Sequence, residues 1–424
     1  MGTLDGFIRQ FTIMSIDRSA GQPLAQRFDP VFARIEAGTV ARERSRELAH
    51  DAVQSLKASG FTALRVPQAY GGAGLSFAQF FPLLSRLAAA DSNLPQILRA
   101  HFSFIEQRLE SNDETARKRW FERIARGEVI GAATSERSGV THNSVTLLPD
   151  PVSGKLQLNG EKYYSTGTLY ADWISVAAHD DQSDLNVVIP AQVPGVARLD
   201  DWDGFGQRLT ASGTTRFDAV AVDESWIVTR YDASQPRRNS LITAFLQTVH
   251  LATLAGIGQA VLRDSITFVQ GRTRTFGVPG QSSPRENPLV QRTVGRIASL
   301  AYSTQGIVER LARRLDELQR KRAESTATTD DYIAADVETF QAQQIVIEQT
   351  LEAATLLFET GGASATSETL RFDRHWRNAR TLASHNPAAQ REAAIGDYYL
   401  NGNAPEERFS QAHASQGRGA RVSA

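Results

Sequence analysis

The chain has 424 residues, with 46 Lys and Arg against 47 Asp and Glu, and a formal net charge of −1. This balance disfavours a protein built to hold nucleic acid, which needs a clear basic excess. Because there is no cysteine, disulfides, thiolate nucleophiles and cysteine-bound zinc or iron–sulfur clusters are excluded. No apolar run approaches the ~20 residues that cross a bilayer, and the first residues lack a secretory signal. We expect a cytoplasmic protein without membrane association, whose start is either Met1 or Met14.

Residues 15–129 are predicted to form an α-helical domain. Residues 27–61 and 76–110 carry apolar side chains at helical spacing, and residues 113–128 form another amphipathic pattern. Between the first two helical stretches lies a loop rich in Pro and Gly, "LRVPQAYGGAGLS".

Residues 130–234 are predicted to form a β domain. The stretch "KLQLNGEKYYSTGTLYADWISVAAH" alternates polar and apolar residues and is rich in Tyr, Thr, Val and Trp. Short strands separated by Gly-containing turns favour a small barrel or sandwich.

Residues 235–402 return to helical periodicity and predict a four-helix bundle. Three long helices are expected over 240–272, 287–324 and 328–362, and a fourth around "RFDRHWRNAR". The fold class is therefore α+β, with a helical domain, a β domain and a bundle in that order. Residues 403–424 are small and polar and are expected to form a flexible tail.

Common cofactor and catalytic motifs are missing. The sequence "GIGQAV" at 256–261 lies inside a helical pattern without a preceding strand, which disfavours a dinucleotide-binding turn. A phosphate-binding P-loop, a zinc-protease HExxH motif and a GxSxG motif are all absent from the chain. The eight histidines are scattered, so we expect no metal site.

One charged stretch near the end needs a separate explanation, "FDRHWRNARTLASHNP" at 372–387. Arg374, Arg377 and Arg380 recur every third residue and form a basic stripe along a helix. His385 follows the stripe, and Pro387 prevents the helix from continuing unchanged. A solvated helix end, where cations complement the helix dipole, is the simplest interpretation.

The order of the three regions resembles the acyl-CoA dehydrogenase fold over about residues 20–402. Local stretches that resemble this family are "VPQAYGGAGLSFAQFFPLLSRLAAAD", "GAATSERSG", "NGEKYYSTGTLYADW", "GRTRTFG" and "LFETGGASAT". One departure concerns the family's Arg-x-x-Phe-Gly pattern, because Arg272 and Arg274 stand four and two residues before Phe276. The resemblance implies a homotetramer and a flavin whose ring lies against the turn in "NGEKYYSTGTLYADW".

A dehydrogenase of this family needs a carboxylate base, and the chain offers none at the matching places. Glu359 precedes the glycine-rich loop and Glu368 follows it, and neither matches. The stretch 372–387, followed by "REAAIGDYYLNG", instead resembles the flavin-dependent monooxygenases of the dibenzothiophene-monooxygenase type. This branch implies reduced FMN supplied by a separate NAD(P)H-dependent flavin reductase. It also implies O2 and the oxygenation of a small organosulfur or aromatic substrate through a C4a-hydroperoxyflavin.

The same resemblance assigns catalytic roles. His385 is the first choice for the group that donates to the flavin-bound oxygen, and His101 the second. Ser165 is the expected hydroxyl near flavin N5. The alternatives stay open: His385 as a plain helix-end residue, His101 as a core histidine and Ser165 as an ordinary turn residue.

Further residues are assigned to the cofactor and the substrate. Thr134 and Ser135 are expected at the flavin ring, Arg272 or Arg274 at its phosphate, and Gly361 and Gly362 where the backbone approaches closely. The residues that could wall an apolar substrate pocket are Tyr70, Phe102, Trp202 and Phe205, although core packing is the simpler explanation for each of them. Ordinary turn, helix-end and capping roles remain the alternatives for the others.

Two competing functions remain. One is an FAD-dependent acyl-CoA dehydrogenase with an atypical base, and the other is a catalytically idle flavin-binding scaffold. Purification with tightly bound FAD that bleaches with an acyl-CoA would favour the dehydrogenase.

Overall fold

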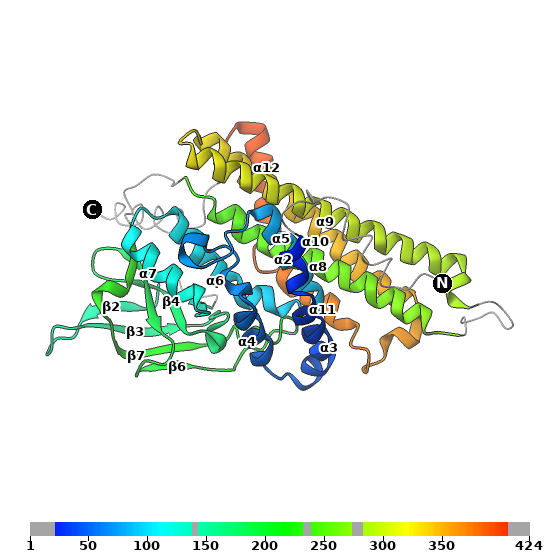
Figure 1. The fold of residues 1–424 in the computed structure, drawn as a ribbon, viewed down its shortest axis with the longest axis horizontal. Coiled ribbons are helices and arrows are strands. Elements are labelled where there is room, and N and C mark those ends of the chain that lie inside the picture. Colours follow the sequence, from blue (N-terminus) through cyan, green and yellow to red (C-terminus); the bar gives the residue numbers. More distant parts are fainter. Residues whose placement is uncertain (1–21, 138–142, 232–238, 274–282, 406–424) are drawn as a thin grey trace, which may run out of the picture.

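A computed structural model describes residues 22–137, 143–231, 239–273 and 283–405. Arg274 and most of the predicted tail lie outside the described residues. Figure 1 shows the β-sheet at one end of the molecule and the long helices running away from it, with the N-terminal helices against both. The predicted α+β class and the order of its three parts are confirmed, while the exact domain boundaries stay predictions.

From residue 22 onward, the N-terminal part contains six α-helices. They are α2 (Gln22–Arg27), α3 (Asp29–Ser45), α4 (His50–Ser59), α5 (Phe77–Ala90), α6 (Asn93–Glu110) and α7 (Glu114–Ala125). The periodic stretch 27–61 is split because Arg46 adopts a left-handed conformation (φ 56°) that ends α3. Helix α5 begins with a capping box between Ser76 and Gln79. Its apolar face packs against the first helix of the bundle.

The β region forms one hydrogen-bonded sheet of eight strands. The strands are β1 (Ile130–Ala133), β2 (Thr146–Pro149), β3 (Leu156–Lys162), β4 (Trp173–His179), β5 (Asp184–Pro190), β6 (Val196–Arg198), β7 (Thr215–Ala221) and β8 (Ile227–Arg230). Their order is β6-β7-β3-β2-β4-β5-β8, and β1 pairs in parallel with β4. Alternate residues face a separate apolar core, which contains Val145, Leu158, Ile174 and Val187.

The C-terminal part contains three long helices, α8 (Ile242–Gln270), α9 (Pro288–Ala323) and α10 (Thr329–Glu359). The predicted fourth helix is α11 (Asp373–Ala383), and a further helix that was not predicted, α12 (Ala388–Asn401), follows it. Pro387 stands at the start of α12, where its fixed φ and missing N–H interrupt the helical hydrogen bonds. The break between α11 and α12 places His385 in an irregular segment.

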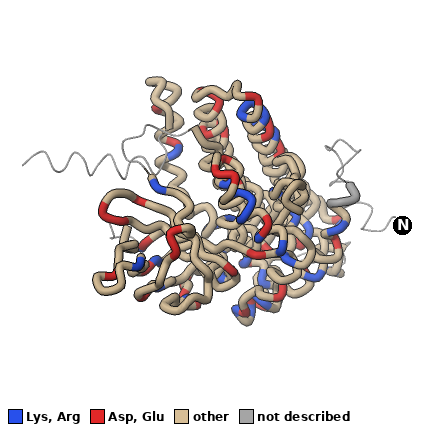
Figure 2. Tube along the Cα trace, turned by 60° about the vertical axis from the view of Figure 1, so that its left-hand side comes forward, with Lys and Arg blue, Asp and Glu red and all other residues tan. Residues whose placement is uncertain are grey.

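Helix α8 is the central helix of the bundle. Among the described helices it alone is long and apolar enough to cross a membrane, but 83% of its most apolar window is buried inside the protein. It packs against α5, α6, α9 and α10. Burial on all sides explains why α8 lacks a polar face. In contrast, Figure 2 shows acidic and basic residues interspersed along the outer helices.

Candidate functional site

His385 lies in the exposed segment between α11 and α12. Its ring packs on the ring of His250 from α8, with 4.4 Å between the centroids and 59° between the planes. Its Nδ1 lies 3.3 Å from Oδ1 of the neighbouring Asn386. The sequence marked His385 as the end of a basic helix, but it gave no sign of His250 as its neighbour.

His250 belongs to the buried interior beneath His385. Its Nε2 lies 3.0 Å from Oε1 of Gln96 on α6. Burial, together with the positive charge of Arg99, lowers the pKa of His250 well below its usual value. The ring is therefore neutral near pH 7 and gives His385 a fixed, uncharged surface to pack on.

Side-chain amides surround the other side of this segment. Asn386 donates from Nδ2 to Oε1 of Gln247 on α8, at 2.7 Å, and its carbonyl accepts from Nε2 of Gln343 on α10, at 3.2 Å. Arg391 on α12 donates to both glutamines. Hydrogen bonds to α8 and α10 thus fix the position of Asn386, the residue next to His385, and Arg391 of α12 holds the two glutamines that make them.

The arginines of α11 anchor the helix that carries His385. Arg374 and His375 both bind Oδ2 of Asp264 on α8, at 2.6 and 2.8 Å. Burial alone would raise the pKa of Asp264, but the hydrogen bond from His375 and the charge of Arg374 hold it far below its usual value. Arg377 reaches the buried Glu43 on α3 at 2.7 Å. The basic stripe is therefore largely an anchor and not a solvated face.

His101 belongs to α6 and is buried against β1, apart from the contacts of His385. Its Nε2 donates to the carbonyl of Thr62 at 2.8 Å, and its Nδ1 accepts from the N–H of Ile130 at 3.2 Å. Burial lowers its pKa to about 4. Because both ring nitrogens bind the backbone, the arrangement favours a structural histidine, and the predicted catalytic role stays a prediction.

The turn after β3 lies beside α6. A Cβ at Gly167 (φ +78°) would stand 2.6 Å from the carbonyl oxygen of Ile97, the residue after Gln96. This close approach puts the turn next to the part of α6 that holds His250. The strand β1 contacts the same turn, because the N–H of Ala132 donates to the carbonyl of Thr166. Thr134 and Ser135 directly follow β1 and are exposed.

Ser165 points into the protein. Its side chain is fully buried, and its hydroxyl lies 3.3 Å from the carbonyl oxygen of Lys162. Thr166 is half-buried, and its Oγ1 lies 2.8 Å from Oγ of Ser212. Thr166 is thus the more accessible hydroxyl of the turn. Thr166 was not among the predicted site residues, although neighbouring side chains in extended backbone point to opposite sides.

Arg272 and Gly361 lie together at the far end of the bundle. A Cβ on Gly361 would stand 2.1 Å from the Phe268 ring and 2.8 Å from Nη1 of Arg272. Gly362 follows with φ +54°. Along α8, Gln270 lies about 30 Å from His250 at the usual helical rise. This distance is far longer than the ribityl phosphate of one FMN, so these residues and His385 of one chain cannot bind the same cofactor.

The four aromatic residues predicted to wall a pocket do not come together. Phe102 is a core residue whose ring centroid lies 4.7 Å from that of Phe80, and Tyr70 packs on Phe121 of α7 at 5.3 Å. Trp202 and Phe205 share the loop between β6 and β7. Phe205 is 54% exposed, and this loop is the part of the predicted set that remains available to a ligand.

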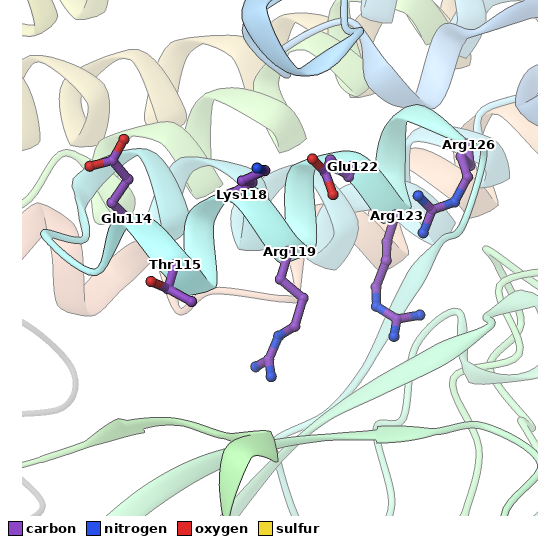
Figure 3. A pocket seen from close by; sticks show the side chains of 7 residues that line it. All are labelled: Glu114, Thr115, Lys118, Arg119, Glu122, Arg123 and Arg126. Carbon is purple, nitrogen blue, oxygen red and sulfur yellow. The ribbon is translucent and has the colours of Figure 1, made fainter.

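A hollow along α7 is separate from all these residues. It is lined by Glu114, Thr115, Lys118, Arg119, Glu122, Arg123 and Arg126. Figure 3 shows Arg119 and Arg123 pointing toward the strands. They bind the Ser225 carbonyl and the Glu128 carboxylate, so they serve to fasten α7 to the β region.

Comparison with known proteins assigns the family. The model named "Acyl-CoA dehydrogenase, N-terminal domain" matches residues 21–128, and "Acyl-CoA dehydrogenase, C-terminal domain" matches residues 248–390. The chain belongs to the acyl-CoA dehydrogenase family. The family resemblance inferred from the sequence is thereby confirmed.

Within this family, the chain is similar to monooxygenases along most of its length. A probable FMNH2-dependent monooxygenase, SfnC of Pseudomonas putida, is 28% identical over 87% of this chain and 96% of its own. The dibenzothiophene monooxygenase of Rhodococcus qingshengii is 27% identical over 88% of this chain and 92% of its own.

Two solved structures share the fold. FMN-bound TdsC from Paenibacillus sp. A11-2 superposes with a TM-score of 0.84 at 24% identity, over 92% of this chain and all of its own. The methanesulfinate monooxygenase MsuC of Pseudomonas fluorescens has a TM-score of 0.80 at 25% identity, over 92% of this chain and 99% of its own.

Proposed function

We propose that the protein is an FMNH2-dependent monooxygenase that acts on a small organosulfur or aromatic compound. The observation that carries this proposal is that a histidine, His385, stands between α11 and α12 and is supported by His250 and Asn386. Glu359 and Glu368, which flank the glycine-rich loop, are exposed at the other end of the bundle. Glu359 lies about 24 Å along α10 from Gln343, too far to serve as a base beside His385.

The described residues fit a flavin in two parts. The ring would lie against the turn at Thr166 and the segment after β1, with Thr134 and Ser135 exposed toward it. The phosphate would be held by Arg272, with Arg274, beside Gly361, all three from a neighbouring subunit. A glycine is needed there because a Cβ would stand 2.1 Å from the Phe268 ring and 2.8 Å from Nη1 of Arg272. FMN fits this arrangement, and FAD is the alternative cofactor.

Bound reduced FMN would supply the two electrons that let O2 deliver one oxygen atom to the substrate and release the other as water. His385 would hold or donate a proton at its exposed ring edge. His250 and the amides would keep that ring in place. Thr166 is proposed as the hydroxyl near the flavin, in place of the buried Ser165.

The proposal also covers the reductase, the assembly and the substrate of the enzyme. A separate NAD(P)H-dependent flavin reductase would supply FMNH2, and the enzyme would work in the cytoplasm as a homotetramer. Its relatives include proteins named for dibenzothiophene and methanesulfinate, which supports an organosulfur substrate. Trp202 and Phe205, with the half-exposed Trp376, would offer aromatic surface to such a compound.

Replacing His385 by Ala tests this function. With an added flavin reductase, the wild-type protein should consume O2 and oxygenate an organosulfur substrate. The variant should still consume O2 but release hydrogen peroxide, with oxygenation lowered about tenfold to a thousandfold. His385→Asn, which keeps a hydrogen-bond donor, should recover part of the oxygenation. Unchanged oxygenation in the Ala variant, or bleaching of bound FAD by an acyl-CoA, would contradict the proposal.

A further inference from the structure

The segment that carries His385 is held by a chain of side chains whose donors and acceptors can be assigned one after another. The chain runs from Arg391 through Gln247 and Asn386 to His385. We propose that it fixes the tautomer of His385, with the proton on Nδ1, so that Nε2 is the nitrogen that gains and loses a proton. Arg391, Gln247 and Asn386 are then positioning residues for His385.

The assignment begins at Arg391, because a guanidinium has donors only. Its Nη1 contacts one side-chain atom of Gln247 and one of Gln343, the latter at 2.6 Å. Both atoms must accept, so both are amide oxygens. The orientations of the two amides, which geometry alone leaves open, are settled by this one residue.

The orientation of Asn386 follows from that of Gln247. The oxygen of Gln247 that faces Arg391 also faces the Asn386 amide at 2.7 Å. Since an oxygen can only accept here, Asn386 must present its NH2 group. Gln343, whose oxygen faces Arg391, has its own NH2 directed at the Asn386 carbonyl, at 3.2 Å. The two glutamines therefore agree on one arrangement.

The remaining atom of the Asn386 amide is the oxygen that faces His385 Nδ1 at 3.3 Å. An acceptor at this place requires a proton on Nδ1. In the neutral ring the lone pair then lies on Nε2, and in the charged ring Nε2 becomes a second donor. The ring plane is fixed separately, because His250, itself bound to Gln96, packs against it.

Burial makes this arrangement costly to reverse. Gln247, Gln343 and Asn386 are 2%, 1% and 6% exposed, so water cannot readily replace a lost partner. Flipping the Asn386 amide would place its oxygen against the oxygen of Gln247. The NH2 group of Asn386 would then face the proton on Nδ1 of His385. Arg391 is held over the Phe340 ring, 4.2 Å from its centroid, which stabilises the first link of the chain.

Nitrogen-15 NMR of histidine-labelled full-length protein tests the tautomer without reference to activity. The signals of His385 are identified by their loss in His385→Ala. Above the pKa of the ring, wild-type Nδ1 should have the chemical shift of a protonated nitrogen. In Arg391→Met and in Gln247→Leu, the Nδ1 shift should move toward that of an unprotonated nitrogen, because the amides are free to turn.

Two control variants separate this effect from lost charge and from misfolding. Arg380→Met removes a cation that lies close before His385 in the sequence. The Arg380 guanidinium contacts Ser384 and not the amides, so this variant should keep the tautomer of His385. Gln247→Glu preserves an acceptor for both Arg391 and Asn386, so this variant should also keep the proton on Nδ1 of His385. An Nδ1 shift that stays that of a protonated nitrogen in both Arg391→Met and Gln247→Leu would overturn the proposal.

The catalytic consequence rests on the proposed function and is measured separately. Arg391→Met should divert O2 from product to hydrogen peroxide about tenfold more than Gln247→Glu does. A changed tautomer without a changed peroxide yield would support the proposed chain of hydrogen bonds and would count against His385 as the proton donor. The two failures are therefore distinguishable.

Discussion

Acidification from pH 7 to pH 5 should destabilise the protein through its buried histidines. His101 and His375 are both fully buried, and burial lowers the pKa of each to about 4. In the unfolded chain the same rings titrate near the ordinary value of about 6.5. Between these two values the unfolded state binds more protons, so the free energy of unfolding falls as the pH falls.

The expected size follows from the two pKa values. For one histidine with a folded pKa of about 4, the free energy of unfolding should decrease by roughly 2 kcal/mol between pH 7 and pH 5. His101 has a clear structural reason for this, because protonation of Nδ1 would remove the acceptor of the Ile130 N–H. His101→Gln removes the titrating ring and should reduce the loss by about that amount.

Urea unfolding at pH 7 and pH 5, followed by tryptophan fluorescence at one fixed protein concentration, measures the difference. His50→Gln is the matched control, since His50 is an exposed histidine on α4. If His101→Gln loses as much stability between the two pH values as the His50→Gln control, the structural interpretation of His101 is wrong.

Two further predictions concern the far end of the bundle. Gly361→Ala should lower stability by roughly 1–3 kcal/mol in thermal or urea unfolding, because its methyl group would collide with the Phe268 ring; Gly396→Ala, where a Cβ meets nothing, is the control. Replacing Arg272 and Arg274 together by Ala should weaken binding of FMN much more than of riboflavin in a fluorescence titration, and equal losses would show that neither arginine binds the phosphate.

Local patterns in the sequence sufficed for the fold. Helical periodicity predicted α8, α9 and α10 to within a few residues, and alternation predicted the strands, because these patterns reflect burial of one face or one stripe. Pro387 also marked the break that exposes His385. The pattern could not show which neighbours the few polar residues of a long apolar helix contact. In α8 these residues are Gln247, His250 and Asp264.

The environment of His385 could not be predicted because its partners are distant in the sequence. Gln247 and Asn386 are 139 residues apart, and Asp264 and Arg374 are 110 apart. Only the packing of α11 and α12 against α8 brings them together. Ser165 shows a different limit, since a shift of one residue decides which hydroxyl of a turn is buried and which is accessible.

The distance between the two ends of the bundle leads to a prediction about assembly. One chain cannot bring His385 and Arg272 to the same FMN, so if both residues act on the cofactor as proposed, each site takes its histidine from one chain and its arginines from another. In a symmetric dimer both sites are built in the same way. Two inactive variants, His385→Ala and the Arg272→Ala, Arg274→Ala pair, should therefore complement each other.

In a mixed dimer, one site receives the intact histidine of the arginine variant and the intact arginines of the histidine variant, while the other site lacks both. Co-expression with two different affinity tags and sequential purification isolates the mixed species. At a low FMN concentration that limits the arginine variant, a tetramer with two chains of each kind should regain up to about half of the wild-type oxygenation, since at most one site in two is complete. A chain that binds its FMN with both sets of residues would give no such recovery, because every site would then carry one of the two defects.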